Sequence, residues 1–464
     1  MHSLPASPSD SIGPPQTQSQ GMYPRNSIMN GVRLHFVLCL AALCLVQETS
    51  TFILDLSPAK FARERYERSR NKTTARTFTP VPNYVQAVDF VSLVNRHGYP
   101  GEEHVVMTAD GYLLRIHRIP GSPSRPRAVG KPVIYMQHGL LASSDTWVLM
   151  GPQRDLAYIL ADAGYDVWLG NVRGNTYSRA HVSLSPDYDP AFWEFSYHEI
   201  ALYDVTAVID YILIKTAQPS LVYIGHSMGT TISYILLSIK PEYNKKIRLL
   251  VSLAPVAFWH APPRAFVRFL IDNTEAIKSF VTNARIYELF PLTAANAQLA
   301  KTTCSDGSIF QQLCMNFVYY SSGYNPEQLN ASEVSYVLSY FPAGTSAQTL
   351  IHFSQNMRTG DFQMYDHGFI RNLATYKQRQ PPMYNLSNII SPVGLFYGKG
   401  DALVSPGNPI ELSQKLPNVL TIEAVPDEKF SHLDFLWSTD IRKLLNDRIF
   451  EFISKTLRQQ NSAL

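Results

Sequence analysis

Short apolar runs alternate with amphipathic stretches along most of the chain. The first two runs, Val105–Thr108 and Leu113–Arg118, flank Asp110-Gly111, a dipeptide typical of a β-hairpin turn. Later runs are apolar throughout, and helical periodicity follows several of them, as in Arg154–Gly164 and Glu199–Thr216. The predicted strands of this second kind are Pro132–Gln137, Tyr165–Leu169, Pro219–Ile224, Leu249–Leu253, Val393–Tyr397 and Val419–Val425. Fully apolar strands joined by helices predict an α/β fold whose mostly parallel sheet is covered on both faces.

The strand pattern stops between Ala254-Pro255 and Pro381-Pro382. The intervening stretch is helical in pattern and contains aromatic clusters, such as Tyr336–Phe341. We interpret residues 258–380 as a helical insertion over one edge of the sheet. Residues 51–257 and 381–464 are then the two parts of one core.

We expect the N-terminal 50 residues to be a disordered lead and a removable signal segment rather than part of the folded core. Residues 1–30 are rich in Ser, Pro, Gln and Asn, without an apolar period. Leu34–Val46 is almost wholly apolar and follows Arg33, but a helix of this length spans only ~20 Å of the ~30 Å hydrocarbon core. The pattern is typical of a secretory signal peptide, and initiation at Met29 would give it a conventional length. A signal-anchor is the alternative.

Composition narrows the class of protein. Of 464 residues, 45% are hydrophobic and 17% are charged, which excludes a disordered chain. Lys and Arg number 40 against 37 Asp and Glu, for a formal charge of +3. That near balance predicts no binding to nucleic acid, because phosphates demand clustered basic charge. The composition of the chain does not indicate its oligomeric state.

Cysteine usage agrees with export. Once Leu34–Val46 is removed, only Cys304 and Cys314 remain, and so close a pair in a secreted chain favours a disulfide over two free buried thiols. Three Asn-x-Ser/Thr sequons are candidate glycan sites in an exported chain. They begin at Asn71, Asn330 and Asn385.

The strongest chemical motif is Gly225–Gly229 (GHSMG). It follows an apolar strand and precedes the helical run Thr230–Ile239. In this G-x-S-x-G pattern, small residues on both sides let a sharp strand-to-helix turn hold the serine clear of the sheet. We therefore predict Ser227 as a nucleophile. An accidental glycine-rich turn is the alternative.

A serine nucleophile needs a base and a carboxylate to orient it. Asp401 follows the strand Val393–Tyr397, and His432 follows Val419–Val425, in the chain order Ser, Asp, His of this fold. We predict His432 as general base and Asp401 as its orienting partner. Among the competitors are His352 and His367 in the insertion, and Asp427 and Asp434 beside His432. We expect Asp434 to cap the following helix.

The developing oxyanion needs two backbone N–H donors. We expect them from Met228, after the nucleophile, and from Leu140 in the loop after Pro132–Gln137. An ordinary loop in which His138 is simply buried is the alternative. No His-Glu-x-x-His motif, closed zinc set or phosphate loop occurs, so we expect neither a metal nor a cofactor.

Seven segments together resemble the acid lipase family that includes gastric lipase and lysosomal acid lipase, with insect members. They are His138–Ser144, Gly170–Arg179, Phe192–Ser196, Gly225–Gly229, Leu253–Ala257, Pro342–Ser346 and His432–Phe435. The resemblance extends from about Val81 to Ile453. It implies an α/β-hydrolase core with a cap-and-lid insertion, a triad on Ser227, Asp401 and His432, and oxyanion donors on Leu140 and Met228.

The same resemblance implies hydrolysis of long-chain lipid esters, triacylglycerol or cholesteryl ester, at a membrane, micelle or lipid-droplet surface. It also implies a lid disulfide at Cys304 and Cys314. One departure is Ser321-Ser322, where family members often carry a further cysteine. We expect a secreted enzyme, with the lysosome as the alternative location. A soluble short-chain carboxylesterase and a non-catalytic lipid-binding protein on a hydrolase scaffold are the alternative functions.

Overall fold

The computed structural model describes residues 88–462, which belong to the unit Pro80–Leu464. The predicted disordered lead, the signal segment Leu34–Val46, the start at Met29 and the sequon at Asn71 lie outside the described residues.

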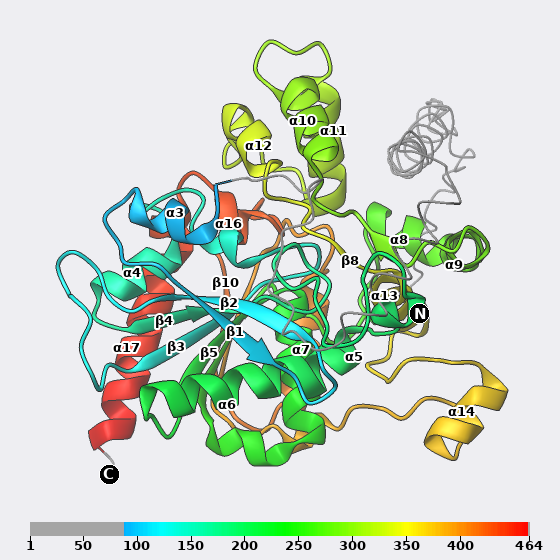
Figure 1. The fold of residues 1–464 in the computed structure, drawn as a ribbon, viewed down its shortest axis with the longest axis horizontal. Helices are drawn as coiled ribbons and strands as arrows, with labels where there is room; N and C mark the ends of the chain where they lie inside the picture. Colours follow the sequence, from blue (N-terminus) through cyan, green and yellow to red (C-terminus); the bar gives the residue numbers. More distant parts are fainter. Residues whose placement is uncertain (1–87, 463–464) are drawn as a thin grey trace, which may run out of the picture. The chain divides into compact units, whose positions relative to one another are not determined.

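One eight-stranded sheet forms the centre of the described chain, in the order β1-β2-β4-β3-β5-β6-β9-β10 (Figure 1). Strands β1 and β2 form the predicted hairpin, and β2 also pairs antiparallel with β4. All pairs from β4 to β10 are parallel, which confirms the predicted α/β class. The strands are β1 (Glu102–Met107), β2 (Leu113–Ile119), β3 (Val133–Gln137), β4 (Asp166–Leu169), β5 (Leu221–His226), β6 (Ile247–Leu253), β9 (Val393–Tyr397) and β10 (Val419–Ala424).

Alternate side chains of the inner strands belong to two separate cores. In β5, Leu221 and Tyr223 pack with α6 and α7, whereas Val222 and Ile224 pack with α4 and α17 on the other face. Helices therefore cover both faces, as Figure 1 shows for α6 and α17. The helices around the sheet are α3 (Phe90–Asn95), α4 (Leu156–Asp162), α5 (Tyr197–Glu199), α6 (Val205–Thr216), α7 (Met228–Ile239), α15 (Gly407–Lys415), α16 (Asp434–Trp437) and α17 (Asp447–Ser462).

Two expectations about these elements need correction. The helix predicted at Glu199–Thr216 begins earlier, at Tyr197, where Ser196 and Glu199 form a capping box, and it widens into a π-helical turn over Ile200–Asp204. Strand β10 is not buried along its whole length, since Leu420 is 49% exposed. It is the outermost strand of the sheet and has a neighbour on one side only.

Between β6 and β9 the chain is mainly helical, as predicted, and we call residues 258–380 the cap. The expectation of no strands there is wrong, because two short strands pair antiparallel. The elements are α8 (Ala265–Asp272), α9 (Thr274–Asn283), β7 (Glu288–Leu289), α10 (Ala294–Cys304), α11 (Gln311–Ser322), α12 (Ala331–Val337), β8 (Thr345–Ser346), α13 (Ala347–Thr359) and α14 (Phe369–Tyr376). The boundaries of the cap stay a prediction.

Candidate active site

Ser227 lies on a tight turn between β5 and α7. Its backbone has φ +52° and ψ −118°, a conformation that a non-glycine residue adopts only under constraint. The neighbouring glycines are required by close packing. A Cβ on Gly229 would lie 2.3 Å from the carbonyl oxygen of Gln137, and one on Gly225 would lie 2.7 Å from the carbonyl carbon of Gly229. The spacing of the motif therefore follows from backbone packing at the turn.

The three predicted catalytic side chains form one hydrogen-bonded chain. Ser227 Oγ lies 2.8 Å from His432 Nε2, and His432 Nδ1 lies 2.7 Å from Asp401 Oδ2. The other carboxylate oxygen of Asp401 accepts the backbone N–H groups of Leu403 and Val404, each at 2.8 Å. Asp401 and His432 are buried. A carboxylate fixed in this way keeps the proton on Nδ1 and leaves Nε2 to accept the serine proton.

The competing residues lie elsewhere. His352 is buried between Ser196 and the carbonyl of Gln363. Asp434 accepts the Ser431 N–H at 2.7 Å and the Asn325 side-chain amide at 2.8 Å. The expectation that Asp434 caps α16 is wrong. It is the first residue of that helix, and its carboxylate instead holds the preceding turn.

The other two competitors also have partners of their own. His367 is half-buried and lies in ring contact with Tyr365 and Tyr376. Asp427 accepts the N–H of Lys429 at 2.9 Å and the side-chain amide of Asn325 at 2.8 Å.

The loop after β3 packs against the nucleophile turn. A Cβ on Gly139 would lie 3.1 Å from Ser227 Cβ, so a larger residue there would press on the turn that holds Ser227. Within residues 88–462, the backbone N–H groups of Leu140 and Met228 donate to no protein acceptor. Donors without a protein acceptor are available to an oxyanion, and Leu140 and Met228 stay the predicted pair.

Comparisons with known proteins agree with this geometry. The model of a partial alpha/beta-hydrolase lipase region matches residues 90–151, and that of the alpha/beta hydrolase fold matches residues 132–436. Lipase 3 of Drosophila melanogaster is 40% identical over 76% of this chain and 90% of that protein. Human gastric triacylglycerol lipase is 39% identical over 78% of this chain and 90% of that protein. The chain belongs to the acid lipase family of α/β-hydrolases.

Solved structures support the fold alone. A putative lipase from Sulfolobus solfataricus has a TM-score of 0.50 and 14% identity, over 76% of this chain and 99% of that chain. Family membership makes this chain an ester-hydrolysing enzyme of the lipase type.

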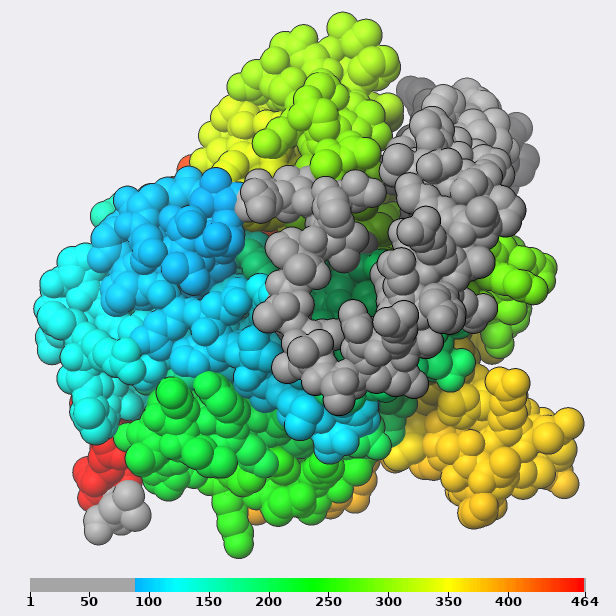
Figure 2. Space-filling view, in the orientation of Figure 1, coloured from blue at the N-terminus to red at the C-terminus, as the bar shows by residue number. Residues whose placement is uncertain are grey.

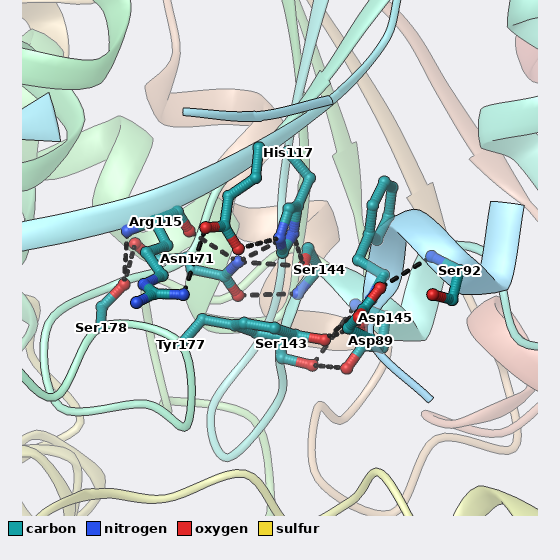
Figure 3. A network of polar contacts seen from close by, with 12 residues as sticks. Asp89, Ser92, Arg115, His117, Ser143, Ser144, Asp145, Asn171, Tyr177 and Ser178 are labelled. Atoms are coloured by element: carbon teal, nitrogen blue, oxygen red, sulfur yellow. Dashed lines mark hydrogen bonds and ion pairs between the residues drawn. The ribbon is translucent and has the colours of Figure 1, made fainter. Parts of the chain in front are cut away.

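A buried polar network holds Ser144, at the end of the loop after β3 in this lipase (Figure 3). The Asn171 side chain accepts the backbone N–H of Ser144 at 2.9 Å and donates to the Ser144 hydroxyl and the Arg115 carbonyl, each at 2.9 Å. His117 Nδ1 lies 2.7 Å from the same hydroxyl. The Asn175 side chain in turn donates to Asn171 at 2.8 Å. The network thus fixes the end of the loop with neutral hydrogen bonds.

Asp145 is the acidic member of this region. Tyr177 donates its hydroxyl to one carboxylate oxygen at 2.8 Å, and Ser143 donates to the other at 3.1 Å (Figure 3). Burial raises the pKa of the Asp145 carboxyl from 3.8 to about 7, although the two hydroxyls oppose this shift. Asp145 is therefore neutral in the folded enzyme under acidic conditions.

His138 and His226 are both buried in neutral form beside the nucleophile. His138 Nδ1 donates to the Gly139 carbonyl at 2.8 Å, and burial lowers the pKa of His138 to about 4. His138 is thus buried, as its alternative interpretation expected, and its hydrogen bond also fixes the start of the loop after β3. His226 Nε2 donates to the carbonyl of His432 at 3.2 Å, and burial lowers its pKa well below the usual value.

Two residues at the end of α11 also contact the site, and no motif in the sequence indicates them. The carbonyl of Ser322 accepts the N–H groups of both Ala402 and His432, each at 3.0 Å, so one peptide group holds the loops that carry Asp401 and His432. Gly323 follows at φ +123°, and a Cβ there would lie 2.3 Å from the Gly400 carbonyl oxygen. A glycine after a helical run was the only available signal, and it indicates a helix end rather than a site.

The remaining predicted residues lie on the surface or in the cap. Cys304 and Cys314 form a disulfide between α10 and α11. Asn330 and Asn385 are exposed, and each side chain accepts the hydroxyl of the serine two residues later. No cluster of three or more metal-ligating side chains occurs among the described residues.

Proposed function

We propose that this lipase hydrolyses carboxylic esters of long-chain lipids, triacylglycerol or cholesteryl ester, through an acyl-enzyme on Ser227. The observation that carries the proposal is the hydrogen-bonded chain from Ser227 through His432 to Asp401. The proposed substrate class is supported by relatives named gastric triacylglycerol lipase. The human protein of that name is 39% identical to this chain.

In this mechanism, His432 Nε2 takes the proton of the Ser227 hydroxyl as Oγ attacks the ester carbonyl. The backbone N–H groups of Leu140 and Met228 stabilise the resulting oxyanion. The tetrahedral intermediate collapses when His432 returns the proton to the departing alcohol. Water, activated by the same imidazole, then hydrolyses the acyl-enzyme, while Asp401 stabilises the imidazolium at each stage.

We further propose that the cap covers the acyl site and moves at a lipid surface. A pocket for a long acyl chain must be apolar, and such a surface left open to water would promote aggregation. A mobile cover removes this conflict, because contacts with lipid replace those of the closed state. The partner of the enzyme is then the lipid surface that holds its substrate.

Export is part of the same proposal. The disulfide between Cys304 and Cys314 and the exposed sequons at Asn330 and Asn385 suit a secreted or lysosomal glycoprotein. Residues 88–462 contain no helix with the length and hydropathy of a membrane span.

The test is a substrate panel with matched variants. Purified enzyme and the Ser227→Ala variant are assayed on short soluble esters, emulsified long-chain triacylglycerol and cholesteryl ester. We expect hydrolysis of the long-chain esters and a loss of about 10³-fold or more in Ser227→Ala and His432→Ala, because only binding and oxyanion contacts remain.

Each alternative has its own outcome in this panel. Hydrolysis of short esters alone would indicate a carboxylesterase. Absence of turnover together with failure of a fluorophosphonate to label Ser227 would indicate a non-catalytic lipid-binding protein. If Asp401→Asn kept substantial activity while Asp434→Asn lost it, the assignment of the carboxylate would be wrong.

A further inference from the structure

We call residues 365–381 the α14 loop. This loop projects from the cap, and its two ends lie close together. The two ends of the loop are held together by backbone hydrogen bonds from Met364 to Pro382, at 2.9 Å, and from Tyr384 to Phe362, at 3.0 Å. A bridge between flanking residues completes a short antiparallel ladder. The loop therefore has a fixed base, and α14 stands apart from the other labelled helices and strands in Figure 1.

Polar contacts within the α14 loop also fix its conformation. The side-chain amide of Gln355 on α13 pairs with both the N–H and the carbonyl of Asp366, each at 2.9 Å. The buried Asn372 donates to the Asp366 carboxylate at 2.7 Å and to the Arg379 carbonyl at 2.9 Å. Tyr376 donates its hydroxyl to a backbone carbonyl on the inner side, at 2.9 Å. The segment is thus an ordered element that needs no hydrophobic core of its own.

The outer side of α14 is apolar and uncovered. Phe369, Ile370 and Leu373 are 54%, 79% and 40% exposed, and their spacing places them on one side of the helix. In Figure 2 this yellow-orange segment projects from the neighbouring described residues. Three large apolar side chains on a fixed support indicate a surface that is covered in use.

Three basic side chains belong to the same loop. Arg371, Lys377 and Arg379 are exposed, and none of them belongs to an ion pair among residues 88–462. The guanidinium of Arg379 lies 5.3 Å from the centroid of the Phe369 ring. Exposed cations outside ion pairs, beside exposed apolar side chains, are typical of a helix that lies in a lipid interface, where the cations meet anionic headgroups.

We propose that the α14 loop docks the enzyme on an anionic lipid surface. Phe369, Ile370 and Leu373 enter the boundary between headgroups and acyl chains, while the basic side chains contact lipid phosphates. A protein partner fits less well, because a standard interface uses about 20–30 residues on each side and α14 offers three apolar anchors. The inference deepens the proposed action at a lipid surface, and the test below does not depend on turnover.

Binding is measured by co-sedimentation with vesicles in the Ser227→Ala background, which separates docking from hydrolysis. One set of vesicles is phosphatidylcholine alone, and the other contains about 30% phosphatidylserine. We expect the Phe369→Ser/Ile370→Ser/Leu373→Ser variant to bind the anionic vesicles roughly tenfold or more weakly, because it loses the buried apolar area. Arg371→Gln/Arg379→Gln should weaken binding to anionic vesicles and leave binding to phosphatidylcholine unchanged.

Matched controls exclude a general loss of structure. Ile214 is 83% exposed on α6, and Ile410 is 42% exposed on α15. Ile214→Ser/Ile410→Ser and Lys245→Gln/Lys443→Gln should bind vesicles like the parent. With Ser227 present, the α14 variants should hydrolyse short soluble esters at the parental rate. Parental vesicle binding by the α14 variants would overturn the proposal, as would a lipid-independent dimer that these variants abolish.

Discussion

Replacing Asp145 by Asn should change how the stability of the enzyme depends on pH. The carboxyl is buried, and its pKa is raised by burial from 3.8 to about 7. Between those two values the unfolded chain has released the proton and the folded chain still holds it, so stability falls as pH rises. Above pH ~7 the loss is complete, and at ~1.36 kcal/mol for each pH unit it amounts to at most ~4 kcal/mol.

Asp145→Asn is neutral at every pH and nearly isosteric, and its side-chain oxygen can still accept the Tyr177 hydroxyl. The free energy of unfolding is measured by urea titration with tryptophan fluorescence, from pH ~4 to pH ~8. We expect little difference near pH 4 and a growing advantage for Asp145→Asn up to pH ~7. The exposed Asp306→Asn is the matched control and should show no such trend. A constant difference between Asp145→Asn and the parent over this range would refute the reasoning.

Three further predictions concern the turn, the cap and the substrate surface. Gly229→Ala should lower the free energy of unfolding by ~1–3 kcal/mol or more and reduce fluorophosphonate labelling, because its Cβ would lie 2.3 Å from the Gln137 carbonyl oxygen. Parental thermal stability and labelling would contradict this. Removing the disulfide by Cys304→Ala/Cys314→Ala should cost roughly 2.5–3 kcal/mol in the chain-entropy model, measured by calorimetry, and should loosen the cap before the core. Unchanged proteolysis of the cap would count against it. Activity on a long-chain ester should rise sharply once the substrate exceeds its solubility, whereas a smooth saturation curve would argue against a moving cover.

The inner strands of the sheet could be predicted because each is a short apolar run in the sequence and is buried in the structure. Val393–Tyr397 has the predicted bounds, since a short apolar run between polar turns has one interpretation. Strand β5 extends two residues further than predicted, through Gly225 and His226. Glycine there was interpreted as the start of the turn, yet the strand continues because Gly225 pairs with β3 and β6. The two-residue strands β7 and β8 are too short to have any periodicity.

In the candidate site, side-chain motifs could be predicted from the sequence, whereas backbone contacts and burial could not. Side-chain chemistry, chain order and position after a strand predicted that Ser227, His432 and Asp401 come together. The contact at Ser322 could not be predicted, because every residue has a backbone carbonyl and the residue type does not indicate which carbonyl accepts a hydrogen bond. The role of Asp145 was missed for a similar reason, since its raised pKa follows from burial by distant segments and not from its neighbours in sequence.

The peptide between Ser322 and Gly323 limits how the cap can be exchanged. Its carbonyl serves the loops of Asp401 and His432 at once, and Gly323 fills a gap against Gly400 in which no larger residue fits. A chimera whose foreign cap lacked this carbonyl and glycine should therefore misplace His432 even if the core folded. A transplant that replaced α10 and the start of α11 but kept residues 318–325 would preserve that alignment. A redesigned cap for this enzyme therefore has to keep the end of α11 and the glycine that follows it.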